Sequence, residues 1–168
     1  MENERGDVHC AFLIGKAPVK TMTIPRLQLT AATVSIRVVE MIARELDEHV
    51  NSRHFWTDST TVLKFISNEN KRFQVFVANR VHTIRDATNP YQLRYVESKR
   101  NPVDDASRGL DGQELSPQCR WITGPNFLRL PESEWPQLPG DLDDIPVDDS
   151  EVKRILVTAR TSMRAKIF

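Results

Sequence analysis

Three aspartates in this 168-residue chain occupy positions where carboxylates could do chemistry. Asp58 ends the short apolar stretch "RHFWTD" (53–58), which we expect to form a buried strand ahead of a helix. Asp104 and Asp105 stand in the first turn of a short helix expected over residues 102–110. Open α/β sheets bind ligands at the carboxyl ends of their strands. If the sheet brings these places together, two or three carboxylates share one small site.

Carboxylates held close together repel one another, and a divalent cation is the usual compensation. Oxygen ligands without histidine or cysteine favour Mg²⁺ or Mn²⁺ over zinc. Two such ions about 4 Å apart are the standard apparatus for attack of water on a phosphodiester. The same residues also have simpler roles, since Asp58 can cap a helix and Asp104 and Asp105 suit the helix dipole. Their spacing alone leaves both interpretations open.

The surrounding sequence predicts strands and helices in alternation. Strands are expected at 8–15, 19–24, 53–58 and 91–98, and helices over 27–46, 60–66, 73–87 and 102–110. We expect Ser59 or Thr60 to cap the second of these helices. This order of elements predicts an α/β fold in which helices flank a mixed sheet.

The composition narrows the function classes. The chain has 23 basic and 23 acidic residues, so it has no overall positive field for nucleic acid. Cys10 and Cys119 lie outside any Cys/His cluster, which excludes a zinc signature and a disulfide framework. No apolar run reaches the roughly 18 residues of a membrane span, and the polar N-terminus does not match a secretory signal. We therefore expect an intracellular protein, cytoplasmic or nuclear, without a membrane partner.

The periodic pattern ends near residue 110. We expect a domain over residues 8–112, followed at 113–137 by an irregular arm whose tryptophans lie against that domain. Residues 138–168 are expected to be a solvated acidic linker followed by a basic tail, which itself could form a helix.

Five stretches of the chain, taken together, resemble one family of proteins. They are "TIPRLQLTAA" (23–32), "FWTDSTTVLKFI" (55–66), "FVANRVHTIRD" (76–86), "SKRNPVDDASRGL" (98–110) and "GPNFLRLPESEWP" (124–136). Their order and spacing are similar to those in BEL/Pao-type LTR retrotransposon polyproteins, in the ribonuclease H-like region labelled the Pao retrotransposon peptidase family. The resemblance covers roughly residues 8–137. It implies neighbouring reverse transcriptase and integrase regions in the parent polyprotein.

In this family, four carboxylates hold two magnesium ions that hydrolyse the RNA strand of an RNA·DNA hybrid. The resemblance assigns the strand aspartate to Asp58 and the late-helix aspartate to Asp104, with Asp105 as its neighbour and alternative. The glutamate of the family pattern "PRLELTAA" falls at Gln28, which carries no charge. The first-strand aspartate has no counterpart here. We therefore expect a ribonuclease H-like mixed sheet that lacks its first, central strand.

With two of the four carboxylates missing, we expect an inactive remnant of a retrotransposon polyprotein that binds Mg²⁺ or Mn²⁺ poorly. Side chains beside the site are expected to contact the phosphates of an RNA·DNA hybrid. These are Lys99, Arg100, Asn101 and Arg108. Two alternatives stay open: an active nuclease whose upstream residues were lost from the coding sequence, and a nucleic-acid-binding module without chemistry.

Overall fold

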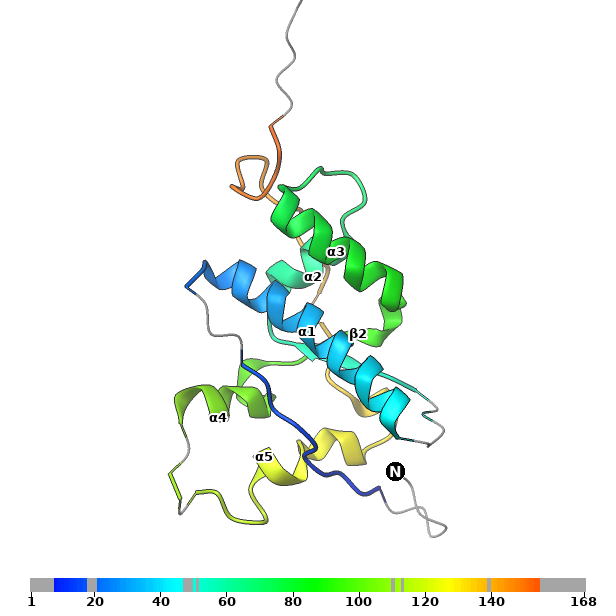
Figure 1. Cartoon of the computed structure of the whole chain (residues 1–168), viewed down its shortest axis with the longest axis vertical. Helices are drawn as coiled ribbons and strands as arrows, with labels where there is room; N and C mark the ends of the chain where they lie inside the picture. The colour runs from blue at the N-terminus through cyan, green and yellow to red at the C-terminus, as the bar shows by residue number, and fades with distance from the viewer. Residues whose placement is uncertain are drawn as a thin grey trace, which may run out of the picture.

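The computed structural model describes residues 8–17, 21–46, 50, 52–109, 111–112, 114–138 and 140–154. In chain order, the α-helices and strands are α1 (Ile24–Glu45), β1 (Phe55–Thr57), α2 (Thr60–Ser67), α3 (Val75–Ala87), β2 (Leu93–Tyr95), α4 (Pro102–Arg108) and α5 (Arg120–Thr123). Figure 1 shows α1 crossing the middle of the molecule, with α2 and α3 to one side and α4 and α5 to the other. Within the described ranges, no helix has both the length and the apolar character that a transmembrane span requires.

Helix α1 confirms the helix expected over residues 27–46 and begins three residues earlier. Pro25 stands in its first turn, where a missing N–H costs nothing. Leu29 and Ile36 are 0% and 2% exposed, and their seven-residue spacing puts both on the face toward the core. Thr33 is buried between them, and its hydroxyl donates to the Leu29 carbonyl at 2.9 Å, so the polar group is satisfied.

Strands β1 and β2 form a parallel pair, with Phe55 beside Leu93. The Val96 N–H donates to the Thr57 carbonyl at 3.0 Å and extends the pairing past β2. Parallel neighbours cannot be joined by a tight turn, and α2 and α3 provide the crossover between them. The two strand predictions on either side of this crossover are confirmed in their central residues, whereas the expected mixed sheet is, among the described residues, this parallel pair.

The helices α1, α2 and α3 enclose one hydrophobic core. Its buried members are Leu29, Ile36, Val62, Phe65, Ile66, Phe73, Val77, Val81, Ile84 and Ile145. On α3 they recur at intervals of four and three residues, which is the period that predicted this helix. The rings of Phe65 and Phe73 meet edge to face at 5.1 Å between centroids and join α2 to the turn before α3.

The predicted N-terminal strands are wrong. Residues 9–17 form no strand, and residues 21–23 lead directly into α1; residues 18–20 lie outside the described part of the chain. The run instead lies against α5, where the Phe12 N–H donates to the Ile122 carbonyl at 2.9 Å and the Phe12 ring lies 5.0 Å from that of Trp121. Strand-like composition requires a neighbouring strand, and this run packs on a helix instead.

The irregular arm lies against β1, as expected. The Trp56 ring lies 4.8 Å from the Phe127 ring and 5.5 Å from the Trp135 ring. The edge of His54 meets Trp135 at 5.0 Å between ring centroids. These aromatic contacts pack the arm against β1, which Asp58 directly follows.

Residues 140–153, which we call the strap, are where the structure departs furthest from the expected solvated linker. Ile145 is 3% exposed and belongs to the core. The Glu151 carbonyl accepts from the Gln74 N–H at 2.7 Å, and Val152 forms an antiparallel bridge with Phe73. The many aspartates of this segment predicted a solvated linker, and its few apolar residues gave no opposing signal. Residues 155–168 of the expected basic tail lie outside the described residues.

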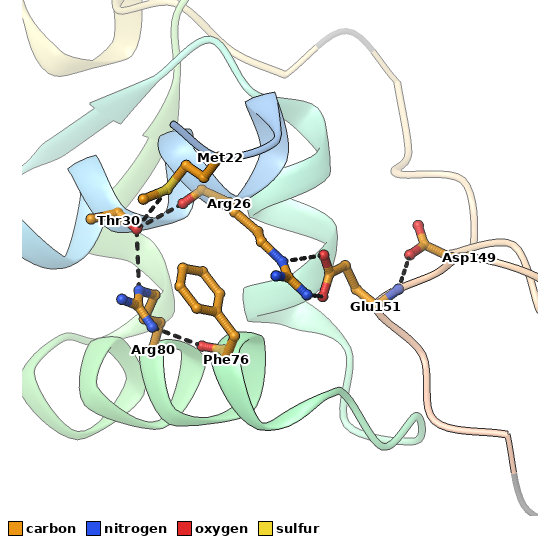
Figure 2. A network of polar contacts seen from close by, with 7 residues as sticks. All are labelled: Met22, Arg26, Thr30, Phe76, Arg80, Asp149 and Glu151. Carbon is orange, nitrogen blue, oxygen red and sulfur yellow. Dashed lines mark hydrogen bonds and ion pairs between the residues drawn. The ribbon is translucent and has the colours of Figure 1, made fainter. Parts of the chain in front are cut away.

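An ion pair ties the strap to α1. Glu151 is 5% exposed, and its two oxygens accept from Arg26 Nε at 2.6 Å and Nη2 at 3.0 Å (Figure 2). Arg26 stands in the first turn of α1. A two-point contact between guanidinium and carboxylate fixes both position and orientation. The strap is therefore part of the folded unit.

Replacing Ile145 tests the role of the strap. We expect Ile145→Ala to lower the free energy of unfolding by about 2–4 kcal/mol, because a buried aliphatic side chain is lost and a cavity remains. Val147 is 81% exposed in the same segment, so Val147→Ala is the matched control and should change stability by less than about 0.5 kcal/mol. Chemical denaturation measures both, and equal effects would mean that the strap does not pack as described.

The lowered pKa of His54 makes the stability of the fold depend on pH. Its Nδ1 is buried with no hydrogen-bond partner in the described residues, and burial first, then the Arg94 charge, lowers the His54 pKa below its ordinary 6.5. Between the folded and the unfolded pKa, His54 is therefore protonated in the unfolded chain and neutral in the folded chain. The stabilising contribution is present above pH 6.5 and is lost as the pH falls through the folded pKa.

We therefore expect the midpoint of thermal unfolding to fall as the pH drops from 7 towards 5, and His54→Gln to flatten that dependence. His82→Gln is the control, because His82 is exposed on α3, 3.2 Å from Asp86, and its replacement should alter the slope less than His54→Gln does. A slope that His54→Gln does not alter would exclude this histidine as the cause.

Candidate functional site

Asp58 lies directly after β1, at the carboxyl end of the parallel pair. Its Oδ2 accepts from the Ser98 hydroxyl at 2.9 Å. Ser98 begins a single 3-10 turn, Ser98–Arg100, that follows β2. Because parallel strands end at the same edge, the segments after β1 and β2 meet here.

Gln28 of α1 points toward this same edge. Its Oε1 accepts from the Ser59 hydroxyl at 2.8 Å. Ser59 is 5% exposed and caps α2, since its Oγ accepts from the Val62 N–H at 3.2 Å. One hydroxyl therefore serves two helices, and the neutral amide of Gln28 clamps α1 to the residue next to Asp58.

Asp104 and Asp105 lie in α4, and each already pairs with an arginine. Asp104 Oδ2 lies 2.6 Å from the guanidinium of Arg108, one turn later. Both oxygens of Asp105 accept from Arg120 of α5 at 2.5 Å. The hydrogen bond from Arg120 lowers the pKa of Asp105, so this carboxyl stays charged.

These ion pairs indicate which of the two aspartates could more readily bind a metal ion. Asp105 joins α4 to α5, whereas Asp104 faces Arg108, whose side chain is 74% exposed. The Asp104 side chain is 22% exposed, but a pair whose cation is largely in solvent contributes about 1 kcal/mol or less. Asp104 is therefore the aspartate that can change partners at lower cost.

The four residues expected to contact a hybrid lie in the 3-10 turn, in α4 and at the residue between them. Lys99 and Arg100 are exposed, and the Arg100 guanidinium lies 5.3 Å from the Phe127 ring centroid. Asn101 caps α4 through its side-chain oxygen, which accepts from the Val103 N–H at 3.2 Å. Arg108 is occupied by Asp104. Lys99 and Arg100 are thus the two cations of this group whose heads remain available.

The donor set does not fit a pair of divalent ions. Two magnesium ions bring four positive charges, whereas Asp58 and Asp104 supply at most two negative ones, and Gln28 supplies none. Asp104 also shares its charge with an arginine. Among the residues that the structure describes, no three acidic, histidine or cysteine side chains form a group that could hold a metal ion.

Sequence reasoning missed the polar partners of this site. The capping position of Ser59 was predicted, but its contact with Gln28 joins residues 31 positions apart and has no local signal. Ser98 and Arg120 were missed for the same reason. Arg120 in particular lies in the stretch without periodicity, and only its contact with Asp105 reveals its role.

A double-mutant cycle tests the clamp between α1 and α2. We expect Gln28→Leu to cost about 1 kcal/mol of unfolding free energy through the lost hydrogen bond. Ser59→Ala should cost about 1–2 kcal/mol, because the cap is also lost. The double variant should be more stable than the sum predicts, by about 0.5 kcal/mol or more. Strict additivity in urea denaturation would show that the two side chains do not interact.

Comparison with known proteins supports one family. Residues 1–59 match the family model of the Pao retrotransposon-like RNaseH-like domain. The match includes Gln28 and Asp58 and ends before α4. Searches of curated proteins and of solved structures find no match. Over its first 59 residues, the chain is therefore similar to the Pao retrotransposon-like RNaseH-like domain.

Proposed function

We propose that this chain is a ribonuclease H-like unit of a retrotransposon polyprotein that keeps its fold and has lost two-metal hydrolysis. The observation that carries the proposal is the contact between Gln28 and Ser59. At the position where the family pattern has a glutamate, this chain uses a neutral amide to join two helices. Gln28 therefore has a structural role, and the negative charge of the family glutamate is absent from the edge that holds Asp58.

The finer fold assignment belongs to the same proposal. A parallel strand pair joined by helices, with an aspartate at its carboxyl edge, supports a ribonuclease H-like α/β sheet flanked by helices over residues 8–112. The irregular arm at 113–137 is a separate covering segment in this proposal. The strap that follows the arm extends the folded unit beyond it.

The unfavourable donor set supports the loss of activity. In the family, the ions stabilise the attacking and leaving oxygens of the phosphodiester, and removing even one source of such stabilisation costs several kcal/mol in the barrier. Asp58 accepts a hydrogen bond from the Ser98 hydroxyl. Its remaining role is to join the end of β1 to the turn after β2.

A binding role without chemistry is the second candidate. Lys99 and Arg100 are exposed beside Asp58, and neither forms an ion pair among the described residues. Such cations bind nucleic-acid phosphates without reading sequence. The partner of this face is then an RNA·DNA hybrid, with the reverse transcriptase and integrase regions of the polyprotein as neighbours in the chain.

A cleavage assay tests the proposal. The chain is incubated with an end-labelled RNA·DNA hybrid in Mg²⁺ and, separately, in Mn²⁺. We expect no more product than the Asp58→Asn variant gives, because the two-ion site is not assembled. Circular dichroism confirms that both proteins are folded. Metal-dependent product from the unaltered chain that disappears in Asp58→Asn would refute the loss of hydrolysis.

A further inference from the structure

The face between α1 and α3 gathers guanidinium groups around one aromatic ring. The Arg80 Cζ lies 3.5 Å from the centroid of the Phe76 ring, and the Arg26 Cζ lies 4.9 Å from the same centroid. Figure 2 shows the Phe76 ring between the two arginine side chains, with Thr30 beside Arg80. Cations on an aromatic face gain electrostatic attraction, which helps hold like charges in one place.

These arginines are not equally compensated. Arg26 has the two-point contact with Glu151. Within the described part of the chain, Arg80 donates to two neutral oxygens, at 3.2 Å to the Thr30 hydroxyl and at 3.1 Å to the Phe76 carbonyl. Among the described residues, neither Arg80 nor the exposed Arg37 forms an ion pair. This face therefore has two guanidiniums without a carboxylate.

Arg26 and Arg80 share the Phe76 ring, and Arg37 lies further along α1. Burial lowers the pKa of Arg80, and the charges of Arg37 and then Arg26 lower it further. Arg37 follows Arg26 by 11 residues, about three helical turns, so both lie on one face of α1 about 16 Å apart along its axis. Glu40 is the acidic residue one turn beyond Arg37, and it is exposed. The cations thus form a row along α1 with Arg80 beside it.

The row is separate from the edge that holds Asp58. Arg37 follows Gln28 by nine residues, about two and a half turns, which puts the two on opposite sides of α1. Gln28 faces Ser59 of the α2 cap, whereas Arg26 and Thr30 face α3. A ligand on the row would not touch Asp58.

We propose that Arg37 and Arg80 bind phosphate groups of a single nucleic-acid strand, on the face of α1 opposite Gln28, and that Glu151 of the strap weakens this binding. The guanidinium fork matches the oxygens of phosphate. Guanidiniums at separate points along α1 suit a strand, whose charges repeat along its length, better than a single free ion. The proposal is independent of the ribonuclease H-like assignment, because it requires neither Gln28 nor Asp58.

Glu151 provides a variant that should change binding in the opposite direction to removal of an arginine. Its carboxylate neutralises Arg26, the neighbour of Arg80 across the Phe76 ring. Removing that negative charge increases the positive potential of the row. Glu151→Gln should therefore tighten binding, whereas removal of a cation loosens it.

Fluorescence anisotropy with a labelled single-stranded oligo(dT) of about eight nucleotides tests the site, since strands of this length suit a short binding row. We expect Arg37→Gln to weaken binding at least threefold and to reduce the slope of log K against log salt by about 1. Arg80→Lys, which keeps the charge and loses the fork, should also weaken it. Glu151→Gln should strengthen it at least twofold.

Arg53→Gln is the matched control, because Arg53 is exposed ahead of β1 and its replacement removes the same charge elsewhere. It should change binding less than Arg37→Gln does. Equal effects of Arg37→Gln and Arg53→Gln, or no saturable binding by the unaltered chain, would overturn the proposal.

A competition arm distinguishes a strand from free phosphate. Inorganic phosphate at millimolar concentration should displace the oligonucleotide only to the extent that sodium chloride of equal ionic strength does. Stronger displacement by phosphate would show a site for the free ion and overturn the assignment to a strand. Thermal unfolding of each variant shows that it is folded, and exposed Arg37 keeps the test decisive if Glu151→Gln or Arg80→Lys is unstable.

Discussion

The parallel pairing of β1 with β2 is the constraint on which the rest of the structure depends. Each strand has three residues, so the pair cannot be stable alone, and its parallel direction requires a long crossover. The crossover is α2 with α3, and their apolar faces close against α1 to form the core. The same pairing brings the ends of both strands to one edge, where Asp58 meets Ser98. Core and candidate site are thus consequences of one arrangement.

The polar residues that the sequence assigned to the site each have a neutral or oppositely charged partner. Gln28 contributes an amide, and the two aspartates of α4 each face an arginine. Every one of these contacts has a structural effect: a joint between α1 and α2, an intrahelical pair, and a joint between α4 and α5. These polar residues therefore hold elements together, and we propose that the site lacks the surplus of negative charge that divalent ions require.

Periodicity predicted the helices because burial on one face of a helix leaves a clear pattern, as with Val77, Val81 and Ile84. It also placed Asp58 at a strand end and Ser59 at a cap. It failed for residues 8–15, since an apolar run does not reveal whether a strand or a helix lies beside it. It failed for the strap because one buried Ile145 and one buried Glu151 give no periodic signal. Contacts such as Arg120 with Asp105 depend on the assembled fold and could not be read locally.

Titration of Mn²⁺ into the ¹⁵N-labelled chain tests the central claim most directly, because the ion broadens the NMR signals of amides near any site that it occupies. The account predicts weak, general broadening that does not saturate and that Asp58→Asn leaves unchanged. Selective broadening of the amides of Asp58, Ser59 and Asp104 that saturates at micromolar Mn²⁺, and disappears in Asp58→Asn, would contradict it.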